Sequence, residues 1–237
     1  MKIGILDADK LSPSIIKKYG CYADLFINLL SPLHNKFSQP LSFKRYNVFD
    51  SDYPQSIHDC DAYIITGSQY SSYEEISWIK ELEDYIRLLS REKIKLIGIC
   101  FGHQMIAQSL GGKVEKNTKG WELGITATHI NEMFDWMQPS REFFFSLVSH
   151  QDHVTQLPEH AINFAETNLS PYSGFCIDRH ILTFQGHPEF SNEYVKLIIK
   201  LQEKDLSNQQ RQSAKASLHQ RDDHELIMNW IFNFINN

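Results

Sequence analysis

One cysteine of the sequence stands in a setting that suits a nucleophile. Cys100 lies within GICFG (98–102), with Gly98 two residues before it and Gly102 two residues after it. This spacing is typical of a sharp strand-to-helix turn, where the nucleophile has a strained backbone and only glycine tolerates the crowding. The thiol would then lie at a helix N-terminus, which favours the thiolate. Free amides, beginning with that of Phe101, would be ready to bind an oxyanion. The alternative is a buried structural cysteine beside packing glycines.

A base and an orienting acid occur together further along the chain. His187 and Glu189 belong to GHPEF (186–190), directly after a predicted strand, ILTFQ. Because Pro188 disfavours helical geometry at the preceding residue, the segment is expected to be extended, and residues two apart then face the same side. Glu189 could therefore fix the orientation and tautomer of the imidazole that a thiolate needs as its base. The alternative is a loop histidine beside a solvated glutamate.

Two more segments place polar groups at predicted strand ends. Gly67 follows the strand AYIIT and could let a backbone amide approach a substrate as an oxyanion donor, although a tight turn explains it equally well. The segment SHQDH (149–153) follows the apolar run FFFSLV and fits a substrate-binding loop. Another interpretation is a metal site formed by His150, Asp152 and His153, but no H-E-x-x-H or comparable ligand frame accompanies these residues.

The elements that must position these residues alternate between strand and helix through the first half of the chain. Apolar runs predict strands at residues 2–7, 41–49, 62–67 and 95–100. Helical spacing of apolar side chains is found at residues 13–30, where Gly20 interrupts it, and at residues 74–89; a further helix follows residue 100 at once and runs to about Leu110. This alternation predicts an α/β fold with a parallel sheet covered on both faces.

The second half is richer in strand patterns and ends in a polar tail. Strands are expected at WELGITATHI, FFFSLVSH, INFAE, GFCID and ILTFQGH, followed by a helix at residues 191–204. The tail ends in the amphipathic run HELIMNWIFNFI. We therefore expect one domain over residues 1–204 and a helical C-terminal extension, residues 205–237, packed on the same domain.

Composition narrows the classes of protein that the chain can be. It has 237 residues, of which 42% are hydrophobic and 12% aromatic, enough for a sizeable core. The formal net charge of −6 argues against a nucleic-acid or anionic-membrane binder, since both normally need a basic face. No apolar run approaches the roughly 18 residues of a membrane span, and none of signal-peptide length opens the chain. The four cysteines are widely spaced and form no C-x-x-C pair, so we expect a cytoplasmic protein.

Three separated blocks together resemble the class I glutamine amidotransferase domain. They are GICFGHQ (98–104), SHQDHV (149–154) and GHPEF (186–190), in the family's order. The resemblance covers most of the chain, from MKIGILD to about residue 203. It implies a flavodoxin-like open, mostly parallel sheet with helices on both faces, and no metal, nucleotide or organic cofactor. It also implies a Cys-His-Glu triad at Cys100, His187 and Glu189.

The resemblance implies roles for further residues. The oxyanion amides of the family correspond to those of Gly67 and Phe101, and its glutamine-recognising glutamine corresponds to Gln104. The loop that holds the amino-acid end of the substrate varies among members. Here it corresponds to His150, Gln151 and Asp152, in a segment that reads SHQD where the amidotransferase domain of GMP synthetase has SHGD.

A finer similarity is to stand-alone members of the family, including plant γ-glutamyl peptidases and GMP synthetase-like bacterial proteins. It is carried by Tyr19-Gly20 and by residues 67–79, 119–125 and 214–218. It implies a small-molecule γ-glutamyl substrate, glutamine or a γ-glutamyl peptide, hydrolysed through a thioester. The alternative is a glutaminase subunit that supplies ammonia to a synthetase partner. A third possibility, a binding protein on the same fold, would predict a broken triad. Because no ATP-binding motif such as G-x-x-x-x-G-K-[ST] is present, we expect the chain to work alone.

Overall fold

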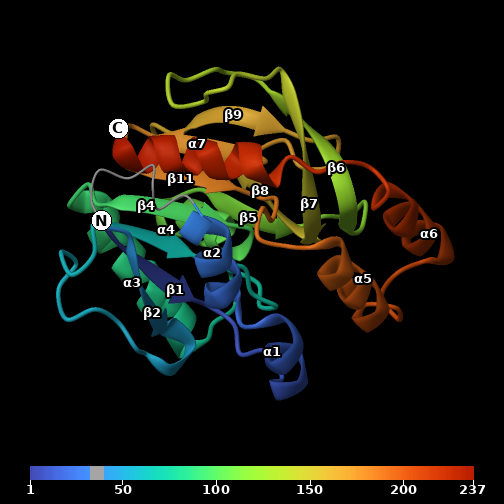
Figure 1. Ribbon diagram of the computed structural model, residues 1–237, viewed down its shortest axis with the longest axis horizontal. Coiled ribbons are helices and arrows are strands. Elements are labelled where there is room, and N and C mark those ends of the chain that lie inside the picture. Colours follow the sequence, from blue (N-terminus) through green and yellow to red (C-terminus); the bar gives the residue numbers. More distant parts are fainter. Residues whose placement is uncertain (33–39) are drawn as a thin grey trace.

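The computed structural model describes residues 1–32 and 40–237 as an α/β structure built on one large sheet (Figure 1). Within these residues the sheet has nine strands in the order β2-β1-β3-β4-β11-β10-β9-β6-β7. They are β1 (Lys2–Asp7), β2 (Ser42–Asn47), β3 (Ala62–Ile65), β4 (Lys95–Ile99), β6 (Glu122–Ile130), β7 (Phe143–His150), β9 (Ile162–Glu166), β10 (Gly174–Ile177) and β11 (Ile181–Phe184). A small second sheet pairs β5 (Lys113–Lys116) with β8 (Asp152–Gln156).

The large sheet has a parallel half and an antiparallel half. Strands β2, β1, β3, β4 and β11 pair in parallel, whereas β10, β9, β6 and β7 pair antiparallel with their neighbours. Strands β3 and β11 are buried along their whole length, as expected for parallel strands covered on both faces. The α/β class and the open sheet predicted from the sequence are thus confirmed.

Helices cover both faces of the sheet. They are α1 (Pro13–Tyr19), α2 (Tyr22–Leu30), α3 (Ser77–Arg91), α4 (Phe101–Ser109), α5 (Asn192–Leu201), α6 (Asn208–Ser217) and α7 (His224–Asn236), with a short 3-10 helix at Val48–Asp50. Strand residues alternate between the two cores: Ile64 of β3 packs with α2 and α7, whereas Ile65 packs with α3 and α4. Figure 1 shows α7 lying across the sheet, with α5 and α6 beyond β6 and β7.

Two of the expected helices have different boundaries in the structure. The helical pattern at residues 13–30 is divided into α1 and α2 because Gly20 adopts a positive φ of 84° and its amide closes α1 on Ile16. Helix α3 begins at Ser77, three residues later than the pattern suggests. The carboxylate of Glu74 instead accepts a hydrogen bond from the Ser71 amide, which holds this stretch in a turn.

The polar segment after β7, expected to be a loop, contains the start of a strand. β8 begins at Asp152 and pairs with β5, with Val114 opposite Val154. Only this one pair is buried in the small sheet, so the alternation is too short to reveal a strand in the sequence.

Helix α7 belongs to the largest core of the molecule. Its buried side chains, Ile227, Met228, Trp230, Ile231, Phe234 and Ile235, pack with residues of β4, β7, β9 and β11. The ammonium of Lys95, at the start of β4, donates to the carbonyl of Phe234 at 2.8 Å and so ties the last turn of α7 to the sheet.

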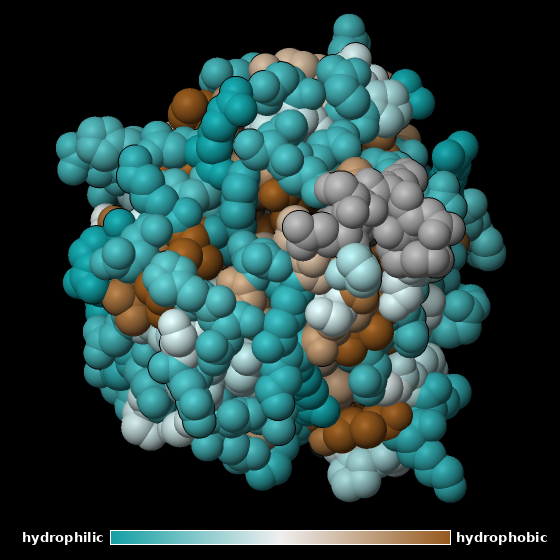
Figure 2. All heavy atoms as spheres, turned by 60° about the vertical axis from the view of Figure 1, so that its left-hand side comes forward, coloured by the Kyte–Doolittle hydropathy of each residue, from teal (hydrophilic) through white to brown (hydrophobic). Residues whose placement is uncertain are grey.

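On the face drawn in Figure 2, hydrophilic residues predominate and hydrophobic ones form small separate patches. Among the helices formed by residues 1–32 and 40–237, none combines the length and apolar character needed to cross a membrane.

Candidate active site

The carboxyl ends of four neighbouring parallel strands meet at one edge of the sheet. β1 leads to Asp9, β3 to Gly67, β4 to Cys100 and β11 to His187. Open α/β sheets bind their ligands at this edge. Asp9, Cys100 and His187 line a cleft of about 730 Å³ here.

Cys100 occupies the sharp turn that its flanking glycines predict. Its backbone has φ 53° and ψ −102°, a rare conformation for a residue other than glycine, and it is the residue directly before α4. A Cβ on Gly102 would lie 2.4 Å from the carbonyl oxygen of Ile65, and one on Gly98 would lie 2.6 Å from that of Gly102. Since backbone blocks both positions, only glycine allows the strand and helix to approach closely enough to present the thiol in the cleft.

His187 and Glu189 face one another in the extended segment after β11. His187 Nδ1 and Glu189 Oε1 are 2.7 Å apart, and their side chains are 3% and 0% exposed, so neither is solvated. Burial lowers the pKa of His187, but hydrogen bonds and electrostatic attraction from Cys100 and Glu189 outweigh it and raise the pKa to about 10. The imidazole also stacks on Phe190, with ring centroids 3.8 Å apart. This arrangement can hold an imidazolium beside a thiolate.

Two buried amide side chains connect Cys100 with the 149–152 segment. Gln185 Nε2 donates to Cys100 Sγ at 3.5 Å, and Gln104 Nε2 donates to Gln185 Oε1 at 3.1 Å and to the carbonyl of Asp152 at 2.8 Å. Gln104 Oε1 receives no hydrogen bond from the described residues, and Gln104 lines the cleft. Sequence reasoning identified Gln104 but missed Gln185, whose only signal is a polar residue directly after the apolar strand ILTF.

The two backbone amides expected to bind an oxyanion lie beside this array. A Cβ on Gly67 would be 2.8 Å from Cε1 of His187, so the backbone at Gly67 is in close contact with the imidazole. Within residues 1–32 and 40–237, no group accepts a hydrogen bond from the Gly67 amide. Phe101 is the first residue of α4, where an amide has no partner within the helix.

The predicted substrate loop is held from three sides. His150 Nδ1 lies 2.9 Å from the carbonyl of Asp152, and its Nε2 lies 3.3 Å from the buried carboxylate of Glu122. Burial alone would raise the pKa of Glu122, but the pairing with His150 outweighs it and lowers the pKa. The Asp152 carboxylate accepts hydrogen bonds from the hydroxyls of Ser71 and Tyr73. His150 and Asp152 therefore bring an imidazole and a carboxylate to one wall of the cleft.

Gln151 and His153 point to other partners. Gln151 Nε2 approaches the carbonyl of Asn117 at 3.5 Å, and His153 Nδ1 lies 3.1 Å from the carbonyl of Leu169. The described part of the chain contains no group of three or more His, Cys, Asp or Glu side chains that could hold a metal ion. The contacts of residues 149–153 thus fit a wall of the cleft better than a set of metal ligands.

The three other cysteines differ from Cys100 in position. Cys21, Cys60 and Cys176 are free and buried, and none of them lines the cleft. Burial raises the pKa of all three thiols, to about 12 for Cys21 and Cys176. These thiols are therefore poor nucleophiles at neutral pH.

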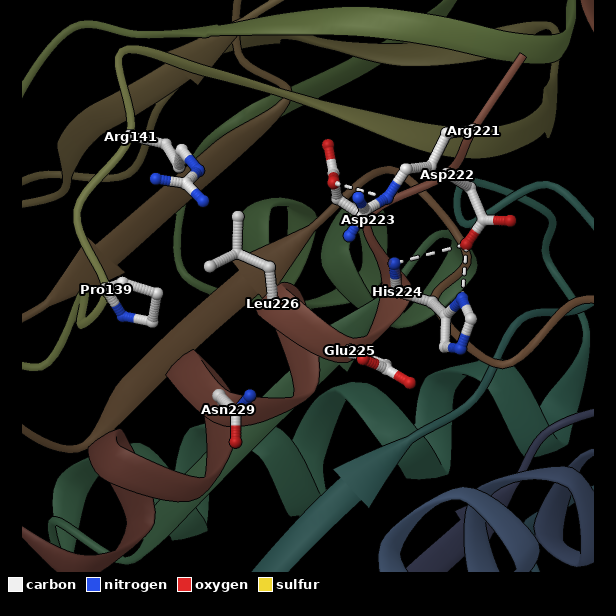
Figure 3. A pocket seen from close by; sticks show the side chains of 9 residues that line it. All are labelled: Pro139, Arg141, Arg221, Asp222, Asp223, His224, Glu225, Leu226 and Asn229. Atoms are coloured by element: carbon white, nitrogen blue, oxygen red, sulfur yellow. Dashed lines mark hydrogen bonds and ion pairs between the residues drawn. The ribbon is translucent and has the colours of Figure 1, made fainter.

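A smaller hollow of about 440 Å³ lies at the start of α7 (Figure 3). Two pairs form among its polar groups: Arg221 with Asp223 at 3.9 Å, and His224 with Asp222. The Asp223 carboxylate also accepts from the Phe145 amide at 2.9 Å, which fixes the start of α7 to β7. These contacts serve the fold, and the hollow contains none of the residues predicted for the site.

Comparisons with known proteins identify the family of the chain. Residues 35–198 match the family model described as glutamine amidotransferase class-I. The chain is 35% identical over 212 residues to a glutamine amidotransferase-like protein of Schizosaccharomyces pombe, covering 84% of this chain and 83% of that one. It is 30% identical over 192 residues to γ-glutamyl peptidase 4 of Arabidopsis thaliana, covering 77% and 73%.

The fold has a counterpart among solved structures. A glutamine amidotransferase of Thermotoga maritima superposes with a TM-score of 0.79 over 100% of this chain and 98% of that one, at 15% sequence identity. This structural similarity shows the fold. The family match over most of the chain shows the family to which the chain is related. The chain belongs to the class I glutamine amidotransferase family.

Proposed function

We propose that the protein hydrolyses the γ-glutamyl amide bond through a Cys100-His187-Glu189 triad. The observation that carries this proposal is the buried array at the floor of the cleft. There His187 lies against Glu189 at 2.7 Å and within hydrogen-bonding and electrostatic reach of Cys100, which a strained turn presents at the start of α4. A nucleophile, a base and an orienting carboxylate in contact are the requirements of thiol-based acyl transfer.

The reaction proceeds in two steps. The Cys100 thiolate attacks the δ-carbonyl carbon of the γ-glutamyl group, and the amides of Gly67 and Phe101 stabilise the oxyanion; losing one such donor typically costs about 2.7–4 kcal/mol. His187 then protonates the leaving nitrogen as the C–N bond breaks. In the second step the same imidazole takes a proton from water, which cleaves the thioester and releases glutamate. Glu189 keeps His187 oriented.

The polar groups around the 149–152 segment suit the amino-acid end of the substrate. The free Gln104 Oε1 and the Asp152 carboxylate can accept from an α-ammonium group. His150 and Gln151 lie on the same wall of the cleft and complete the loop that the family resemblance assigns to the amino-acid end of the substrate. These groups would hold the γ-glutamyl moiety with its carbonyl over Cys100.

The size of the cleft favours a γ-glutamyl conjugate over glutamine. Tyr22, Tyr194 and Ile198 also line the cleft. Both tyrosines pack on Phe190, which stacks on His187, so they lie near the imidazole that must protonate the leaving amine. Ammonia as leaving group needs no such space. The relative named as a γ-glutamyl peptidase matches over most of both chains. We therefore favour a hydrolase that works alone over a glutaminase subunit that feeds a synthetase.

Steady-state hydrolysis by the purified single chain tests this function. Glutamine, γ-glutamyl dipeptides and glutathione are compared, with Cys100→Ala as the control. We expect a substantial kcat/KM for at least one γ-glutamyl peptide, and loss of that activity in Cys100→Ala. Negligible turnover of every substrate, rising by orders of magnitude when a synthetase is added, would instead establish the subunit function.

A further inference from the structure

The His187 side of the cleft contains a buried carboxylate that the proposed triad does not use. Asp9 follows β1, lines the cleft and is 3% exposed. Its Oδ1 accepts hydrogen bonds from Gln69 Nε2 at 2.9 Å and from the Lys10 amide at 2.8 Å. These contacts fix the position of the carboxylate but leave its charge without a counter-ion.

The described residues offer no cation to Asp9. No ion pair of Asp9 is formed within residues 1–32 and 40–237, and the ammonium of the adjacent Lys10 lies instead near Asp50, at 3.8 Å, and over the ring of Phe49. Burial raises the pKa of Asp9 to about 6, although hydrogen bonds from Gln69 and Lys10 oppose the shift. Buried carboxylates are ordinarily paired, so an unpaired one at a ligand cleft points to a charge that arrives with the ligand.

Aromatic side chains surround the same part of the cleft. Tyr22, Phe190 and Tyr194 are buried and line it, with ring centroids 4.7 Å apart for Phe190 and Tyr194 and 5.8 Å for Tyr22 and Phe190. Both tyrosines lie within electrostatic reach of Asp9 and of Glu189, which places them beside the triad. A carboxylate among aromatic rings is a favourable environment for an organic ammonium group.

We propose that Asp9, Tyr22 and Tyr194 form a subsite for a positively charged group on the leaving amine. This inference rests on the proposed hydrolysis and names its substrate class: γ-glutamyl amides of amines that carry a second ammonium group. The leaving nitrogen must face His187 to be protonated, so the remainder of the amine extends along the wall that these three residues form. An α-carboxylate on the leaving group would meet Asp9 with a like charge.

Three synthetic substrates of similar size test the subsite on the full chain. They are γ-glutamyl-diaminobutane, its uncharged isostere γ-glutamyl-pentylamine, and the anionic γ-glutamyl-aminobutyrate. We expect kcat/KM to fall in that order. The cation should exceed the neutral isostere by roughly tenfold to a hundredfold, as expected of a charge-assisted hydrogen bond.

Substitution of the carboxylate provides the second measurement. Asp9→Asn can still accept from Gln69 and Lys10, so the fold has no reason to change. The ratio of kcat/KM for cation over isostere should drop to near one. Glu193→Gln removes the same charge from the exposed surface of α5, outside the cleft, and should leave the ratio as in the wild type.

The pH dependence of the same ratio adds a readout that needs no variant. The titratable groups around Asp9 are Asp7 on β1, Tyr22 on α2, Tyr194 on α5, and Glu189. Burial raises the pKa of Asp9 to about 6. Because protonation removes its charge, the preference for the cation should be lost as pH falls through that value.

The outcomes distinguish failure of the proposed subsite from failure of the proposed hydrolase function. Equal rates on all three substrates, a preference for the neutral or anionic amide, or an unchanged ratio in Asp9→Asn would overturn the subsite and leave the hydrolase intact. No hydrolysis of these substrates, of glutamine or of any γ-glutamyl peptide would overturn the proposed function itself. If Asp9→Asn fails to fold, the order of kcat/KM in the wild type and the pH dependence of the cation-over-isostere ratio still decide whether the subsite exists.

Discussion

At the scale of single residues, the chemistry depends on how strongly His187 holds its proton. Burial disfavours the imidazolium, and Cys100 and Glu189 reverse this preference and raise the pKa to about 10. A group with a raised pKa keeps its proton below that value and loses it as pH rises through it. The imidazolium that protonates the leaving amine should therefore persist through neutral pH, and activity should decline in an alkaline limb.

Glu189→Gln tests the orienting carboxylate. His187→Ala removes the general acid and base, which typically contributes roughly 10²–10⁴-fold, and Glu189→Gln should lower kcat by a smaller factor. The alkaline limb of the pH profile should also move to lower pH, because one of the charges that raise the pKa of His187 is gone. Equal activity of wild type and Glu189→Gln on every substrate would remove Glu189 from the triad.

Gln185 gives a second prediction at this scale. It donates to Cys100 Sγ and braces Gln104, so Gln185→Leu should both lower kcat and raise KM, each by roughly tenfold, the cost of one hydrogen bond to a charged group. A double-mutant cycle with Gln104→Leu measures the connection. The two effects should be non-additive because the side chains share a bond. Strict additivity, in variants with unchanged circular dichroism, would show that no such connection exists.

At the scale of elements, the strand-turn-helix around Cys100 determines the site. Its position was predictable because the two glycines leave a local signature, and the structure shows backbone at both sites where a Cβ would stand. GHPEF was equally readable, since Pro188 and the i, i+2 spacing are local features. Gln185 and Asp9 were not, because their roles arise only when β1, β4 and β11 become neighbours in the sheet.

Other elements also differ in whether the local sequence predicts them or whether they depend on tertiary contacts. The strands of the parallel half are recognisable as apolar runs, whereas the sequence around the start of β8 suggests a loop because its pairing with β5 buries little. The amphipathic pattern of the last helix was visible, but the core that it covers depends on residues of β4, β7, β9 and β11. The spacing of apolar residues in a sequence identifies the apolar face of a helix. It does not show which strands that face packs against.

Gly102→Ala tests the turn. The new Cβ would lie 2.4 Å from the Ile65 carbonyl oxygen, so strand and helix must separate. We expect a loss of about 1–3 kcal/mol in the free energy of unfolding and a large loss of kcat. The control is Gly111→Ala, where no atom lies within 4 Å and only the backbone strain of a positive φ is added. Activity per folded molecule should survive in Gly111→Ala, and its survival in Gly102→Ala would contradict the account of the turn.

At the scale of the whole molecule, α7 is a structural layer that contributes no residue to the lining of the cleft. Trp230 is fully buried, packs edge-on against Phe144 and donates to the carbonyl of Pro139 at 3.1 Å. Trp230→Ala should lower the free energy of unfolding by about 3–5 kcal/mol, measured by urea denaturation. The exposed Lys215→Ala on α6 should change it little. Since Trp230 does not line the cleft, kcat/KM per folded molecule should be retained.

The central claim is that Cys100 carries the γ-glutamyl group during turnover. Acid quenching of the purified chain in the presence of a γ-glutamyl substrate, followed by peptide mass mapping, tests it most directly. We predict a γ-glutamyl thioester on Cys100, and labelling of the same residue by a glutamine-mimicking diazo-ketone with complete loss of activity. The acyl group or the inactivating label on Cys21, Cys60 or Cys176, with Cys100→Ala still active, would contradict the account.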